Sequence, residues 1–283
     1  MATLSEAPTP APARQRRSRG RRSLGVGSSL SLGIATVWLS LLVLIPLAAV
    51  LVSAADLGPS GFWHVVTERQ TLSALKLTVL ESVLVTVLNV VMGTMLAWVL
   101  VRDRFWGKSL LDLVIDVPFA LPTIVAGLVL LSLYGPKSPL GIHANNTRYA
   151  VFLALAFVTL PFVVRTVQPV LETIERDVEE AAASLGASRL ATFRRVILPS
   201  LVPAIAAGAA LAFARALSEY GSLVLLSGSL PRRTEVASNR VYSFIENGNR
   251  PAASAIAAIL LVVALVVIVV LDLLQRRLAR RDS

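Results

Sequence analysis

Six long apolar segments constrain the fold of this chain more than any other feature. Of its 283 residues, 55% are hydrophobic and only 16% are charged, and a soluble domain cannot bury that much apolar surface. A helix needs about 20 mainly apolar residues to cross the hydrocarbon core of a bilayer. We therefore predict an all-α membrane protein whose six transmembrane helices cover residues 31–54, 77–101, 109–134, 149–167, 201–226 and 252–274.

The basic residues lie mainly on one side of these predicted spans. With the N-terminus placed inside the cell, the interior segments hold 17 Lys and Arg residues and the exterior segments hold 7. This bias is what the positive-inside rule describes. The net charge of +10 therefore indicates an N-in/C-in topology rather than a partner made of nucleic acid.

The two ends of the chain differ from the apolar segments in composition. Residues 1–30 are rich in Pro, Ala, Ser and Arg, a composition with little to pack, so we predict a disordered basic cytoplasmic tail. Residues 31–54 then form the first transmembrane helix, residues 75–274 the transmembrane core, and residues 275–283 a second basic cytoplasmic tail.

Signs of catalysis are weak. The chain has no cysteine and two histidines, and neither histidine has a carboxylate cluster near it, so we expect no metal or other cofactor. Gly107-Lys108-Ser109 looks like the end of a phosphate-binding loop, but Arg102 stands where that motif needs its first glycine. The chain itself is therefore not predicted to be an enzyme.

The interior segment 171–200 has the pattern of a helix–turn–helix. Apolar residues recur at spacings of three and four from Leu171 onward, which places them on one face of a helix. Gly186 should end this helix, Ser188 should cap a second one, and Pro199 should break the path before the next span. The first helix carries five acidic residues, which anionic headgroups would repel. A protein partner is thus favoured over the alternative, a helix lying on lipid.

This segment resembles the EAA loop of the permeases of ATP-driven (ABC) importers. The sequence runs Glu180-Ala-Ala-Ala-Ser-Leu-Gly186 and ends in Leu198-Pro199, with Val196 in place of the usual Ile. The resemblance implies that the loop couples the permease to a separate ATPase. The residues that it assigns to this coupling are Glu180, Ala181, Ala182, Gly186, Leu190, Phe193, Leu198 and Pro199.

Three further motifs extend the resemblance over most of the chain. Asp116-Val-Pro-Phe-Ala-Leu-Pro122, residues 160–169 and residues 212–222 are similar to the T-type permease of sulfate/thiosulfate importers. Glu219-Tyr-Gly-Ser222 differs from the Glu-Phe-Gly-Ala that is usual in molybdate permeases, although Ser218 stands where the sulfate family most often has Gly. The resemblance implies a type I ABC importer permease fold.

The same resemblance implies the partners. They are a cytoplasmic ATPase dimer, which uses the ATP, a second permease subunit of the W type, and an extracytoplasmic sulfate-binding protein. Whether the second permease is a paralogue or another copy of this chain stays open at this stage, as does the choice among sulfate, thiosulfate, selenate and molybdate.

Charged residues inside the apolar segments are candidates for function, because they are costly in hydrocarbon. Arg215 and Glu219 are four residues apart and close enough to pair on a helix. We interpret them as an intramembrane ion pair or as part of the translocation path, together with hydroxyl groups nearby. The full set is Arg215, Ser218, Glu219, Tyr220 and Ser222.

The third predicted span carries other polar and helix-breaking residues. Asp112 and Asp116 should lie at its cytoplasmic start, and Pro118 and Pro122 should kink it. Arg165, on the fourth span, should extend its side chain to the cytoplasmic surface.

Two other interpretations of the whole chain remain. A molybdate or tungstate permease of the same fold would keep the EAA loop and change only the cargo. A secondary transporter driven by an ion gradient would need no ATPase, and it would usually show an inverted repeat, of which we find no convincing trace in the sequence.

Overall fold

The structure is a computed structural model that describes residues 26–279, and it has no β-strand in that range. The chain divides into two units, residues 1–47 and 48–283. The predicted disorder of residues 1–25 and the end of the second basic tail, residues 280–283, lie outside the described part of the chain.

The first unit is helical throughout its described residues. Helix α1 (Val26–Leu39) continues through a π-helical turn (Ser40–Leu44) into α2 (Ile45–Ala55). Residues 26–30, which we assigned to the disordered tail, therefore belong to the helix. Apolar side chains occupy all its faces, which is typical of a helix surrounded by lipid or by another protein.

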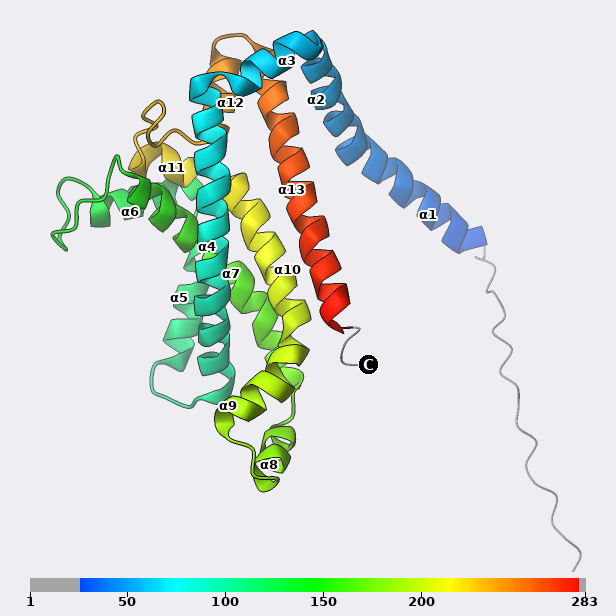
Figure 1. Cartoon of the computed structure of the whole chain (residues 1–283), viewed down its shortest axis with the longest axis vertical. Coiled ribbons are helices and arrows are strands. Elements are labelled where there is room, and N and C mark those ends of the chain that lie inside the picture. The colour runs from blue at the N-terminus through cyan, green and yellow to red at the C-terminus, as the bar shows by residue number, and fades with distance from the viewer. Residues whose placement is uncertain (1–25, 280–283) are drawn as a thin grey trace, which may run out of the picture. The chain divides into compact units, whose positions relative to one another are not determined.

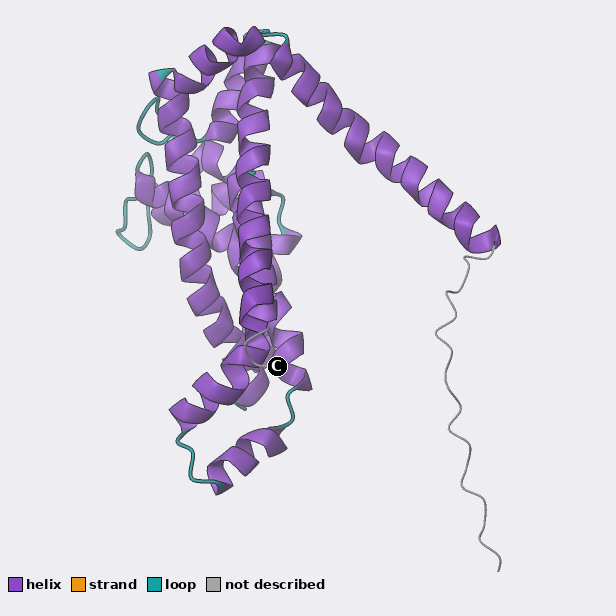
Figure 2. Ribbon diagram, turned by 45° about the vertical axis from the view of Figure 1, so that its right-hand side comes forward, coloured by secondary structure: helices purple, strands orange, loops and turns teal. Residues whose placement is uncertain are grey.

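The second unit is a bundle of long helices joined by shorter ones (Figures 1 and 2). Five helices among the described residues are long and apolar enough to cross a membrane, and the count rises to six if one bent pair is a single span. The helices after α2 are α3 (Gly58–Thr67), α4 (Arg69–Arg102), α5 (Lys108–Ala120), α6 (Thr123–Tyr134), α7 (Arg148–Thr173), α8 (Arg176–Ser184), α9 (Arg189–Thr192), the π-helical turn η2 (Phe193–Ile197), α10 (Leu198–Leu217), α11 (Gly221–Leu226), α12 (Ala237–Glu246) and α13 (Arg250–Ala279).

The bent pair is the third predicted span. We expected one kinked helix over residues 109–134, whereas α5 and α6 are separate helices at an angle of 118°. The break lies at Leu121, whose backbone is extended. A residue before proline disfavours the helical conformation, so Pro122 explains why the chain leaves the helix at this point.

The fifth predicted span, residues 201–226, is also wrong, both at its start and in its interior, although its predicted end at Leu226 matches the end of α11 (Gly221–Leu226). A continuous helix runs from Arg189 through η2 to Leu217, then breaks and resumes as the short α11. Pro199 does not interrupt it, contrary to our prediction. Directly before this proline the Leu198 N–H donates to the Phe193 carbonyl, five residues back, and such a π-turn adjusts the helix so that it can contain a proline.

Helix α7 forms the centre of the bundle, with α4 and α10 packed against it. A Cβ atom on Gly208 of α10 would lie 2.3 Å from Thr166 Oγ1 of α7, so only glycine permits this approach. The small residues of α10 therefore form a packing surface, as expected for helices in lipid. Helix α13 buries an Ala-rich first half and exposes large apolar side chains along its second half.

Candidate functional site

The candidate coupling loop lies at one end of the bundle, where α8 and α9 project beyond the long helices (Figures 1 and 2). Its first helix is shorter than predicted, because it begins at Arg176 and not at Leu171. Leu171 is fully buried in α7, and Glu175 between the two helices has an extended backbone. The apolar periodicity that joined Leu171 to the loop thus belongs to two different helices.

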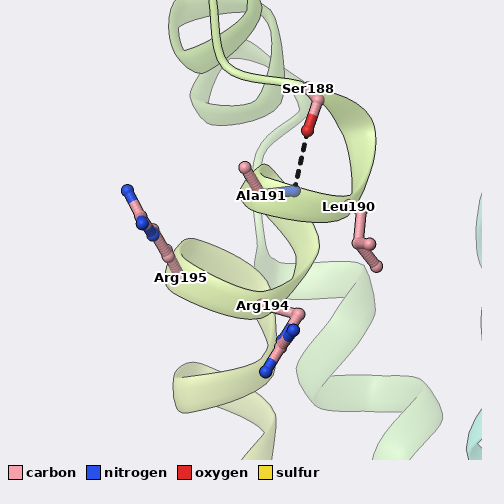
Figure 3. A pocket seen from close by; sticks show the side chains of 5 residues that line it. All are labelled: Ser188, Leu190, Ala191, Arg194 and Arg195. Carbon is pink, nitrogen blue, oxygen red and sulfur yellow. Dashed lines mark hydrogen bonds between the residues drawn. The ribbon is translucent and has the colours of Figure 1, made fainter.

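The turn of the loop has the local geometry that we predicted. Gly186 has a left-handed backbone with φ +82. Its N–H donates to the Ala183 carbonyl and the next N–H, of Ala187, donates to the Ala182 carbonyl, which is the Schellman pattern for ending a helix. Ser188 then caps α9, since its Oγ accepts a hydrogen bond of 3.3 Å from the Ala191 N–H (Figure 3).

Large apolar side chains are uncovered on both sides of this turn. Leu185 is 89% exposed and Leu190 is 66% exposed. Glu180 and Ala181 are exposed on α8, and Ala182 is half-buried. A rigid loop that displays leucines beside acidic residues has the features of a docking surface rather than of a folded core.

Besides Ala182, three predicted coupling residues are half-buried, and these three lie after the turn. Phe193 is half-buried, with its ring 5.4 Å from that of Trp98 in an edge-on contact. Leu198 and Pro199 are half-buried where α10 begins. In this structure the three therefore hold the base of the loop rather than its exposed tip.

Two residues that hold the loop were missed at the level of sequence. Trp98 and Arg102, at the end of α4, contact η2 and α8 respectively. The only signal was an aromatic and a basic residue near the end of a span, a combination that usually indicates the membrane interface.

The structure brings together the second predicted group at the break between α10 and α11. Glu219 is only 1% exposed, and its Oε2 lies 2.6 Å from Arg215 Nη1. Ser222 donates to the other carboxylate oxygen twice, from its N–H at 2.9 Å and from its Oγ at 2.8 Å. The buried charge thus has both an ionic partner and hydrogen-bond donors, the condition under which burial is tolerated.

The five residues of this group differ in accessibility. Ser218 is exposed, Arg215 and Tyr220 are half-buried, and Glu219 and Ser222 are buried. The Tyr220 ring also lies 5.3 Å from that of Tyr242. In this conformation, only the first three could touch a solute.

A further charged cluster joins α5 to α7. Arg165 contacts the carboxylates of Asp112 and Asp116, each at 2.7 Å, and also donates to Gln168 Oε1. Our prediction that Arg165 extends to the cytoplasmic surface did not include these partners, which lie one helical turn apart on α5 and face it together.

Comparison with known proteins places this geometry in a family. The model of the family described as "Binding-protein-dependent transport system inner membrane component" matches residues 89–281. The sulfate transport system permease protein CysT of Salmonella typhimurium is 42% identical over 248 residues, which are 85% of this chain and 90% of that protein. CysT of Synechocystis is 42% identical over 85% of this chain and 86% of the relative.

Solved structures agree on the fold at much lower identity. A chain of a bacterial alginate ABC transporter, in complex with a pentasaccharide-bound periplasmic protein, has a TM-score of 0.74 at 19% identity and covers 89% of this chain and 94% of its own. A chain of an amino acid ABC transporter has a TM-score of 0.56 at 23% identity, covering 74% and 94%. The chain therefore belongs to the family of binding-protein-dependent transport system inner membrane components, and within it to the T-type sulfate permeases.

Proposed function

We propose that this chain is the permease subunit through which an ATP-driven importer moves sulfate across the cytoplasmic membrane. The observation that carries the proposal is the sequence identity of 42%, over 85% of the chain, to proteins named as sulfate transport permeases. Because this similarity extends over nearly the whole length of those relatives, it covers both the spans and the loop.

The loop between α7 and α10 supports ATP-driven rather than gradient-driven transport. Its turn is held by backbone hydrogen bonds and a serine cap, yet Leu185 and Leu190 remain uncovered. A surface of this kind gains free energy when a partner removes the leucines from water. We assign the partner as a cytoplasmic ATPase dimer, which binds and hydrolyses the ATP, so the permease needs no cofactor of its own.

The break after α10 is our candidate for the translocation path. The pair Arg215–Glu219 is neutral as a unit and holds the break in shape, so it adds no net charge that would repel or trap a dianion. Hydroxyl groups and backbone N–H groups can bind an oxyanion without a free cation. Ser218 carries an exposed hydroxyl beside the pair; it donates to the Arg215 carbonyl in this structure and would rotate to donate to an oxyanion.

The remaining parts of the importer are proposed from the resemblance to the family. We propose a second permease subunit of the W type, a sulfate-binding protein on the outer side, and thiosulfate as a second cargo. The topology is N-in/C-in, which places α8 and α9 in the cytoplasm beside the ATPase, and it is supported by the excess of Lys and Arg in the interior segments.

Uptake of radiolabelled sulfate tests this proposal in cells with and without the chain. We expect uptake to disappear on deletion, to require a hydrolysis-competent ATPase partner, and to be blocked by excess thiosulfate but not by molybdate. Normal sulfate uptake with lost molybdate uptake would assign the chain to the other oxyanion. Uptake that persists with an inactive ATPase would instead support a gradient-driven transporter.

A further inference from the structure

The last turn of α4 contacts the coupling loop on both sides of Gly186. Arg102 Nη2 lies 2.7 Å from Glu179 Oε1 of α8. The Trp98 ring, one turn earlier, lies edge-on against Phe193 of η2. Both helical parts of the loop are thus joined to the same end of the same span.

Arg102 also contacts the backbone at the junction between α7 and α8. The same Nη2 donates a hydrogen bond of 2.9 Å to the carbonyl of Ile174, the residue directly after the end of α7. The Arg102 side chain is only 10% exposed and that of Glu179 is 26% exposed. Solvent and salt therefore screen this pair less than an ion pair on an open surface.

Helix α8 has little else to hold it against the bundle. None of its described side chains is buried, so α8 contributes nothing to the packed interior. If a partner moves α8, that movement can reach the spans through its covalent connections, to α7 on one side and across Gly186 to the continuous α9–α10 helix on the other. The contact with Arg102 is the route that leads to α4.

Helix α4 is suited to carry such a movement to the other end of the bundle. It is continuous over 34 residues, which at about 1.5 Å per residue is roughly 50 Å. At its far end, Gln70 Nε2 donates to Glu235 Oε2 at 2.8 Å, and Thr78 Oγ1 accepts from the Ala237 N–H at 2.8 Å. One helix therefore has defined contacts with the loop at one end and with the start of α12 at the other.

We propose that Arg102 is a positioning residue that transmits movement of the coupling loop to α4 through its ion pair with Glu179. The proposal rests on the proposed function, because it gives a mechanical role to a loop that we assign to an ATPase. It adds a residue outside the EAA motif, on a span that contributes nothing to that motif.

Charge reversal in the purified complex tests the pair. The variants are Arg102→Glu, Glu179→Arg and the double reversal, each assembled with the ATPase and the sulfate-binding protein. The readout is the rate of ATP hydrolysis with sulfate-loaded binding protein divided by the rate without it, per assembled complex. We expect each single reversal to lower this ratio about fivefold or more. The double reversal restores the ion pair but not the hydrogen bond from residue 102 to the Ile174 carbonyl, so we expect it to recover most, and not all, of the lost ratio.

This readout separates coupling from a merely structural role, which would lower the yield of complex but leave the ratio per complex unchanged. Arg104→Glu is the matched control. It makes the same charge change two residues away, at an exposed side chain for which the described structure shows no ion pair, and we expect it to keep the wild-type ratio.

Three results would overturn the inference. They are a wild-type ratio in Arg102→Glu, a double reversal no better than the single ones, and an equal loss in Arg104→Glu. If a single variant fails to assemble, the double reversal decides, because the pair predicts that both assembly and the ratio return. Failure of the proposed function looks different, since the wild-type complex would then show no response to sulfate-loaded binding protein.

Discussion

Two of the places where the chain leaves the helical path, the turn at Gly186 and the break just before Gly221, need glycine for different reasons. A Cβ on Gly186 would meet nothing within 4 Å, but the backbone there has φ +82, which favours glycine over other residues. Gly221, after the break in the fifth predicted span, has no such φ. A Cβ at this position would lie 2.2 Å from Thr123 Oγ1 and 2.9 Å from the Ile124 nitrogen. Glycine is needed here because there is no room for a side chain.

The two sites also differ in which contacts hold the backbone in place. Hydrogen bonds among residues 181–191 form the loop turn, which leaves its leucines exposed. The break at residues 218–220 is held from several helices, because Arg215 and Ser222 bind the Glu219 carboxylate and Ser238 of α12 donates to its backbone carbonyl. A locally encoded turn can serve as a docking surface, whereas a buried break depends on the whole bundle.

The largest effect should come from removing the positive charge of Arg215, which neutralises the buried Glu219 carboxylate at the break. Arg215→Gln leaves Glu219 buried without a counter-charge, which should cost about 3–5 kcal/mol of stability. Thermal unfolding in detergent measures this, with the exposed Arg104→Gln as the control. The double variant Arg215→Gln/Glu219→Gln should lose less than the sum of the single losses, and strict additivity would contradict the pairing.

Crowding the same break from the neighbouring helix should have the next largest effect. A Cβ on Gly127 of α6 would lie 2.7 Å from the Ser222 carbonyl oxygen, so Gly127→Val should destabilise the permease by about 1–3 kcal/mol through overpacking. Gly33→Val is the matched control, since its Cβ would meet no atom within 4 Å. Equal unfolding midpoints for the two variants would show that α6 and α11 are not packed as described.

Straining the exposed turn should separate stability from coupling. Gly186→Val places a β-branched residue at a left-handed position, at a local cost of about 1–3 kcal/mol. Because the turn is exposed, we expect a nearly unchanged unfolding midpoint but loss of ATPase co-purification and of uptake. Gly186→Asn is the control, as asparagine tolerates this backbone better. Normal co-purification with the valine variant would count heavily against the docking surface.

The smallest effect should come from the cap of α9. Ser188→Ala removes the acceptor for the Ala191 N–H, which should cost the helix about 1 kcal/mol. Hydrogen exchange at the Ala191 amide should then be about fivefold faster, with only a modest fall in uptake. Ser188→Asp keeps an acceptor at the same position and should exchange like wild type. Unchanged exchange in the alanine variant would mean that the cap contributes nothing.

Hydropathy and local backbone chemistry could be predicted well from the residues alone. Long apolar segments give long helices because lipid offers the backbone no other hydrogen-bond partners. The turn at Gly186 and the cap at Ser188 follow from preferences that act within a few residues. The chemistry of the loop, and with it the family, was therefore accessible before the fold was known.

The remaining features of the fold and of the candidate site depend on contacts between segments that are far apart in the sequence. Nothing local shows that the fifth predicted span breaks at Ser218, that Arg165 pairs with two aspartates on another helix, or that Arg102 reaches α8. The apolar period that runs through Leu171 into the loop is equally consistent with one helix or with two. A periodic pattern in the sequence shows which face of a helix is apolar. The partner of each buried charge, and the residue at which each packed helix ends, depend on segments that come into contact only when the chain folds.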